Sequence, residues 1–124
     1  MTPGVLLAAL VFFQLKHLVA DYVLQTGWML RDKAAYGRPG GLVHAGIHVL
    51  LSAPILVWLG GGLVTVSGLL LAEFLLHYHI DWLKARLSLR AGLQVHERRY
   101  WIAHGADQSL HQLTYVGILL AHLT

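Results

Sequence analysis

Apolar residues dominate four segments of the chain, and each segment is long enough to cross a bilayer as a helix. About 20 helical residues span a hydrocarbon core of roughly 30 Å. The second segment is short and contains Pro54, which predicts a kink or a tilted helix. The pattern predicts an all-α, polytopic membrane protein with one domain, residues 1–124, folded as a four-transmembrane-helix bundle. The predicted spans run from about Gly4 to Leu24, Leu42 to Leu59, Leu63 to Leu83 and Tyr100 to His122.

Histidine and aspartate recur inside these apolar segments in pairs spaced i, i+4. The two members of such a pair lie one turn apart on the same face of a helix. A charged side chain costs about 2.5 kcal/mol or more at the centre of a membrane helix. We therefore expect these eight side chains to face the interior of the bundle and to form one buried site. The pairs are His17/Asp21, His44/His48, His77/Asp81 and Asp107/His111.

The composition supports a membrane protein. Of the 124 residues, 56% are hydrophobic and 12% are charged, against roughly 45–50% and 25% in soluble domains. The absence of cysteine excludes disulfides and thiolate metal ligands. The sequence Met-Thr-Pro-Gly at the N-terminus has no basic region of the kind that begins a signal peptide, so we expect the first span to be retained.

The basic residues predict the orientation. They lie between the first and second spans and around the connection between the third and fourth, while the Gly60-Gly61-Gly62 turn and the termini have none. Positively charged loops stay in the cytoplasm, so the termini and the glycine turn should face outward. The same rule explains the net charge of +3 without a nucleic-acid partner. Other polar residues are expected at the interface or in solvent: Arg31, Asp32, Lys33, His79, His96, Glu97 and His122.

The four pairs are predicted to lie at one depth. At a rise of 1.5 Å per residue, each pair lies about 10–14 Å from the nearest cytoplasmic marker. The first two pairs also parallel the last two, with offsets of 60 and 63 residues. Two hairpins related as a parallel repeat would explain this, as in some transporters; a coincidence of spacing is the alternative.

Imidazole and carboxylate groups in this arrangement favour a divalent-metal site. Both are ligands of zinc and of other first-row ions, with manganese and iron as alternatives to zinc. Eight groups exceed the needs of one tetrahedral ion, so either two ions bind or half of the groups orient the ligands. The alternative without metal is hydrogen bonding between helices. The candidate ligands are His17, Asp21, His44, His48, His77, Asp81, Asp107 and His111.

Other polar residues near this layer are candidates for supporting roles. Gln25 and Gln108 are expected to be hydrogen-bond partners, and His104 is a weaker candidate ligand. Lys16 and Glu73 lie near the midplane, where we predict an ion pair. The alternative makes Glu73 an acid/base group or a ligand.

Several strings resemble a known family. They are His17-Leu-Val-Ala-Asp21-Tyr-Val-Leu-Gln25-Thr-Gly-Trp-Met29, His44-Ala-Gly-Ile-His48, His77-Tyr-His-Ile-Asp81-Trp-Leu-Lys84 and Asp107-Gln-Ser-Leu-His111. Together they resemble a bacterial family of small integral-membrane proteins known only as a domain of unknown function. That family is similar to predicted membrane-bound metal-dependent hydrolases. The resemblance implies a helical fold in the bacterial inner membrane, and it supports the candidate ligands together with Gln25, Lys84 and Gln108.

The leading hypothesis is a metal-dependent hydrolase that acts on an amphiphilic substrate, such as a lipid phosphate or isoprenoid, at the cytoplasmic leaflet. A divalent ion lowers the pKa of a bound water towards about 7, and Asp107 or Asp21 would act as general base. Partners would then be membrane lipids, with a homo-oligomer as an option. The alternatives are a metal-ion or proton transporter or channel, a haem protein with His48 and His111 as axial ligands, and a structural scaffold.

Overall fold

The structure is a computed structural model that describes residues 1–123, and all the regular secondary structure in this range is helical. The all-α prediction is therefore confirmed. The elements are α1 (Pro3–Leu18), the π-helical segment η1 (Val19–Leu24), α2 (Gly27–Asp32), α3 (Pro39–Trp58), α4 (Leu63–Arg90) and α5 (Arg98–Leu123).

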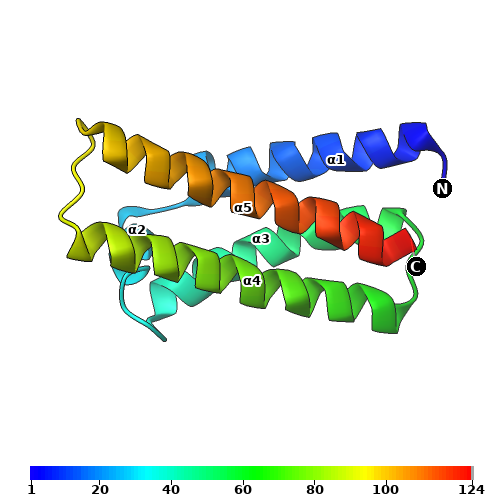
Figure 1. The fold of residues 1–124 in the computed structure, drawn as a ribbon. Helices are drawn as coiled ribbons and strands as arrows, with labels where there is room; N and C mark the ends of the chain where they lie inside the picture. Colours follow the sequence, from blue (N-terminus) through cyan, green and yellow to red (C-terminus); the bar gives the residue numbers. More distant parts are fainter. Residues whose placement is uncertain (124) are drawn as a thin grey trace.

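The four long helices lie side by side and alternate in direction (Figure 1). Helix α3 packs against α1 and α4, and α5 packs against α4 and α1. The two termini and the α3–α4 turn lie at one end of the bundle. The connection between α4 and α5 lies at the other end, flanked by Arg90 of α4 and by Arg98 and Arg99 of α5 (Figure 1).

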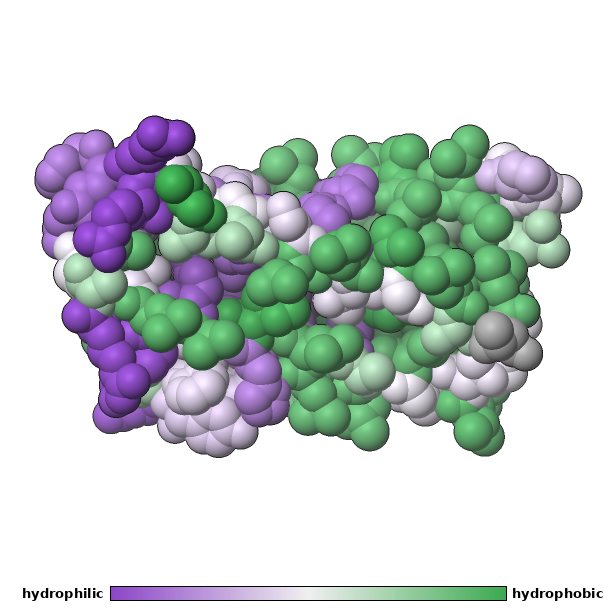
Figure 2. Space-filling model, viewed as in Figure 1, coloured by the Kyte–Doolittle hydropathy of each residue, from purple (hydrophilic) through white to green (hydrophobic). Residues whose placement is uncertain are grey.

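Three helical segments are long and apolar enough to cross a membrane: Pro3–Leu24, Pro39–Trp58 and Leu63–Arg90. Many of their outward-facing side chains are apolar and exposed on the surface; for example, Leu50 is 74% exposed and Val64 is 87% exposed. Figure 2 shows a hydrophobic surface over most of the bundle, with hydrophilic residues gathered at the end that carries the α4–α5 connection. The chain therefore has the features of a membrane protein. Helix α5 is not among the three segments, since polar residues recur along its length.

Several boundaries differ from the prediction. Helix α3 begins at Pro39 rather than Leu42, because proline suits the first helical turn, and the Asp32 carboxylate accepts a hydrogen bond from the Gly40 amide at 2.9 Å. Helix α4 continues past Leu83 to Arg90. The short helix α2 was not predicted; the Thr26 hydroxyl caps its N-terminus.

The end of the first helix is wound as a π-helix. The α-helical pattern stops at Leu18, and the wider turn continues through Val19–Leu24 until the extended backbone of Gln25 ends it. Short π-helical stretches inside helices are rare and occur often at functional sites. Here the segment carries Asp21, so its local winding determines where that carboxylate lies.

The interior of the bundle has two different halves. Near the termini, the buried residues form an apolar core: Ala9, Phe13, Ile55, Leu56, Val66, Tyr115, Ile118 and Leu119. Towards the basic end, most of the buried side chains are polar or ionisable.

Candidate metal centre

The polar half of the bundle brings together the side chains of all four i, i+4 pairs. Seven of the eight candidate ligands are buried, and the eighth, Asp21, has a side chain that is only 11% exposed. They come from α1, η1, α3, α4 and α5. Because each pair occupies one face of its helix, the four faces point to a common centre. The spacing pattern thus led to residues that are close together in the structure.

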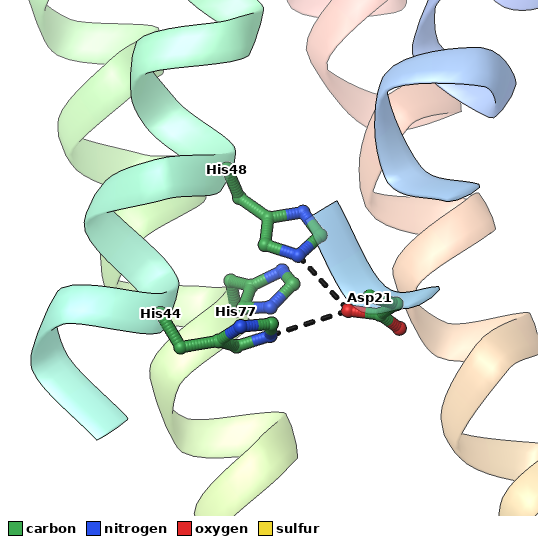
Figure 3. Close-up of side chains that lie close together, drawn as sticks. All are labelled: Asp21, His44, His48 and His77. Atoms are coloured by element: carbon green, nitrogen blue, oxygen red, sulfur yellow. Dashed lines mark hydrogen bonds and ion pairs between the residues drawn. The ribbon is translucent and has the colours of Figure 1, made fainter. Parts of the chain in front are cut away.

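Asp21 is the centre of a first ligand group. Its Oδ1 lies 3.0 Å from His48 Nε2 and 3.2 Å from His44 Nε2 (Figure 3). The His77 ring packs on the His48 ring with 3.7 Å between centroids. One ligand atom from each of these four residues lies within 4.8 Å of the others, and three of the four are fully buried. This group could hold a metal ion.

Asp81 is the centre of a second group, with His77 and His111. Its Oδ1 lies 3.3 Å from His111 Nε2, and its Oδ2 lies 3.3 Å from both His77 Nε2 and His44 Nε2. The two groups share His77, and His44 lies between the two aspartates. They are therefore two parts of one centre.

His17 and Asp107 lie beside these groups rather than within them. His17 Nε2 lies 3.2 Å from Asp21 Oδ2, but it is also 3.0 Å from Gln108 Oε1. Asp107 Oδ1 lies 3.6 Å from His111 Nε2. Gln108 connects the two parts, since its amide donates to Asp21 Oδ2 and to Asp107 Oδ2.

Several buried polar atoms of the centre have no hydrogen-bond partner among the described residues. They include both ring nitrogens of His44, Nε2 of His77 and Oδ1 of Asp107. A buried polar atom left unpaired costs about 1–3 kcal/mol, so such atoms are rare. Ligands of one tetrahedral zinc ion, each at about 2.0–2.1 Å from the metal, lie roughly 3.3 Å apart. The distances from His44 and His77 to the aspartate oxygens match that separation.

The charges in this half of the bundle also favour a cation. Lys16 and Glu73 form the predicted intramembrane ion pair, and Ser52 donates a hydrogen bond to the same Glu73 oxygen at 2.9 Å. Lys33 is the second ammonium group, 2.9 Å from Asp81 Oδ2. A third ammonium group, that of Lys84, lines the same cavity as the three aspartates. The four carboxylates of Asp21, Glu73, Asp81 and Asp107 outnumber these three ammonium groups by one, and a bound cation would offset this excess if every histidine is neutral.

Three residues of the centre were not predicted. The Tyr115 hydroxyl lies 2.7 Å from His17 Nδ1 and 3.4 Å from His48 Nδ1. Tyr115 follows His111 by four residues, and Ser52 follows His48 by four, so an extension of the i, i+4 series would have found both. Lys33 was expected at the interface or in solvent; the structure corrects the solvated alternative, because its side chain is only 11% exposed and its ammonium group lies against Asp81.

The predicted supporting residues lie towards the basic end. The Gln25 side-chain amide donates to the Asp21 backbone carbonyl at 3.0 Å. His104 Nε2 lies 3.2 Å from the Tyr22 hydroxyl and belongs to neither ligand group. Lys84 Nζ lies 5.8 Å from the centroid of the Tyr100 ring. A cavity of about 350 Å³ lies among these residues and reaches the three aspartates of the centre.

The model of one protein family, described as "Protein of unknown function (DUF3307)", matches residues 9–124, so the chain belongs to this family. Comparison with curated proteins and with solved structures found no match.

Proposed function

We propose that this member of the DUF3307 family is a membrane-embedded metalloprotein that binds a divalent ion between Asp21, His44, His48 and His77. The observation that carries the proposal is the pair of buried histidines, His44 and His77, whose Nε2 atoms point at carboxylates without a hydrogen bond. Three imidazoles and one carboxylate form a ligand set that suits zinc. Manganese and iron also accept such ligands.

A second ion fits the other part of the centre. Asp21 contacts His17, one turn earlier on its own helix, and His48 on the next helix. Asp81 contacts His77, one turn earlier on its own helix, and His111 on the next helix. Each of these two distances differs from the corresponding Asp21 distance by no more than 0.3 Å. This correspondence supports a parallel repeat of two hairpins. Because His77 belongs to both groups, two ions would require Asp107 or His17 to complete a set.

The proposed topology has four spans, with α5 as the fourth. Helix α5 packs along α4 and α1, and two of the polar residues that lower its hydropathy, Asp107 and His111, are buried inside the bundle. The basic residues at one end of the bundle support a cytoplasmic position for that end, with the termini outside. We assign the protein to the bacterial inner membrane on the family resemblance.

The reaction that fits this centre best is hydrolysis. A divalent ion polarises a phosphoryl or carbonyl oxygen and supplies a nucleophilic water at neutral pH. Asp107 is the proposed general base. Its Oδ1 is buried, has no hydrogen-bond partner among the described residues and lies 3.6 Å from His111 Nε2, whereas both oxygens of Asp21 have closer partners. The cavity of about 350 Å³ gives a small headgroup access to the three aspartates from the cytoplasmic side.

Metal analysis of the purified protein tests this proposal. We expect the wild-type protein to retain stoichiometric metal after dialysis, and to unfold at a lower temperature when a chelator removes it. His44→Gln should lower the metal content, whereas His96→Gln, in the exposed α4–α5 connection, should not. A metal-free wild-type protein whose stability does not respond to chelation would overturn the proposal and leave a scaffold role.

Ion or proton transport is the second candidate, because the polar network continues from His48 through Lys16 to Glu73. The apolar core between Phe13 and Leu119 fills the remaining half of the bundle and opposes a path through one chain. Uptake assays in liposomes with Asp81→Asn would detect transport if an oligomer completes the path.

A further inference from the structure

An apolar crevice follows the outer side of the bundle between α4 and α5. It consists of two cavities of about 420 and 530 Å³, which share Leu76, Ile80 and Leu110 as lining residues. The surface around this side of the bundle is mostly hydrophobic (Figure 2). A crevice of this kind can take a hydrocarbon chain directly from the surrounding bilayer.

The crevice meets the cavity of the candidate metal centre. Lys84 and Asp107 line both the crevice and the cavity that reaches Asp21 and Asp81. The apolar crevice therefore meets the polar cavity at the ammonium group of Lys84, and the same cavity reaches the proposed ligands Asp21 and Asp81. This order of surfaces is complementary to an amphiphile with one long chain and an anionic head.

The crevice is long enough for a hydrocarbon chain on the side of the metal centre that faces the termini. Gly117 lines this part, ten residues after Asp107 on α5. Ten residues of helix rise about 15 Å, which is half of the roughly 30 Å hydrocarbon core. A chain whose head lies beside Asp107 would therefore run about 15 Å along the crevice to reach Gly117.

We propose that the crevice binds the chain of a membrane lipid with a phosphate headgroup, and that Lys84 positions that headgroup at the metal centre. The cavity is lined by three carboxylates and by two ammonium groups, of which Lys33 pairs with Asp81. A phosphate head is favoured over a neutral or zwitterionic head once the proposed ion is bound, because a phosphate oxygen is a ligand for a divalent ion and Lys84 lines the same cavity. The choice of phosphate and the assignment of this lipid as a substrate rest on the proposed function. Occupation of the crevice by a hydrocarbon chain does not.

A matched pair of glycine variants tests chain binding. A Cβ added at Gly117 or at Gly105 meets open space, and both residues are on exposed positions of α5, but only Gly117 lines the crevice. Gly117→Leu should weaken binding of phosphatidic acid to the purified protein in detergent by about tenfold. The added leucine side chain would occupy space that the lipid chain fills, and overpacking of this kind is costly. Gly105→Leu should bind as the wild type does. Equal binding by all three proteins would overturn the proposal.

The headgroup is tested separately. Phosphatidic acid should bind in preference to phosphatidylcholine, and Lys84→Gln should reduce that preference, whereas inorganic phosphate alone should bind more weakly than the lipid. If inorganic phosphate binds as tightly as phosphatidic acid, the chain contributes nothing and the proposal is wrong. It is also wrong if Gly117→Leu leaves lipid binding intact but changes the oligomeric state, since a second copy then covers the crevice.

Metal content measured on the same samples separates this proposal from the proposed function. A Gly117→Leu protein that retains metal and binds lipid like the wild type refutes the crevice proposal alone. A wild-type protein without metal that still loses lipid binding on Gly117→Leu refutes the metalloprotein proposal and supports the crevice.

Discussion

Replacing Asp21 by asparagine removes the charge at the centre of the first ligand group with little change in shape. Both oxygens are in use: Oδ1 lies 3.2 Å from His44 Nε2 and 3.0 Å from His48 Nε2, and Oδ2 lies 3.2 Å from His17 Nε2 and accepts a hydrogen bond from Gln108. Asparagine keeps one oxygen and presents a donor on the other side, so two of these contacts are lost. The ion also loses an anionic ligand and has a neutral amide in its place. Changing even the groups that orient a metal ligand typically costs about 10- to 100-fold in metal affinity, so we expect a loss of about 100-fold or more when the ligand itself loses its charge.

The assay is a competition titration with a zinc chelator on the detergent-purified protein, with helical content measured on the same samples. Asp32→Asn is the matched control, because the Asp32 carboxylate caps α3 through the Gly40 amide and contacts no candidate ligand. We expect its metal affinity to equal that of the wild type. If folded Asp21→Asn binds zinc as tightly as the wild type, Asp21 is not a ligand and the argument from the first ligand group is wrong.

Three further predictions concern residues around the centre. Lys16→Met should lower the free energy of unfolding by about 3–5 kcal/mol because it leaves Glu73 as an unpaired buried charge; Lys16→Met combined with Glu73→Leu should recover most of the loss in a denaturant titration, and a single variant as stable as the wild type would contradict this. Tyr115→Phe removes the hydroxyl that contacts two imidazoles and should weaken metal binding about 10- to 100-fold, measured by the same chelator competition; an unchanged affinity would mean that this hydroxyl does not orient the ligands. Lys33→Met removes an ammonium group that competes with metal for Asp81, so metal affinity should rise about tenfold or more; weaker binding would show instead that Lys33 stabilises the centre.

Much of the helical architecture could be predicted because two features of this sequence agree, the length of its apolar segments and the i, i+4 spacing of its ionisable residues. Long apolar segments predict helices, and the i, i+4 spacing of His17/Asp21 and His77/Asp81 predicts which face of each helix turns inward. Because polar groups are costly in contact with lipid, the polar faces of the helices should turn towards one another inside the bundle. The structure brings them together from every long helix.

The parts of the structure that were not predicted depend on local backbone conformation, which the hydrophobic pattern and the i, i+4 spacing do not report. The π-helical winding of Val19–Leu24 has no signal in the composition of the segment, yet it sets the position of Asp21. Lys33 lies in a polar connection and was expected at the interface or in solvent, because local sequence does not show that the chain folds back onto Asp81. The prediction ended the third span at Leu83, where the apolar segment ends. Helix α4 continues for about two more turns to Arg90, because its backbone hydrogen bonds do not depend on apolar side chains.

The sequence alone determined that the chain is helical and rich in membrane-compatible segments, and that eight ionisable side chains lie on inward faces. These properties follow from composition and from the 3.6-residue period of the helix, which are local. Only the tertiary structure decided that His44 lies between the two aspartates, that His77 belongs to both ligand groups, and that the α4–α5 crevice opens onto Asp107. Those relations depend on the rotation and axial offset of each helix against its neighbours. Both are set by side-chain packing across the whole bundle, which no single segment encodes.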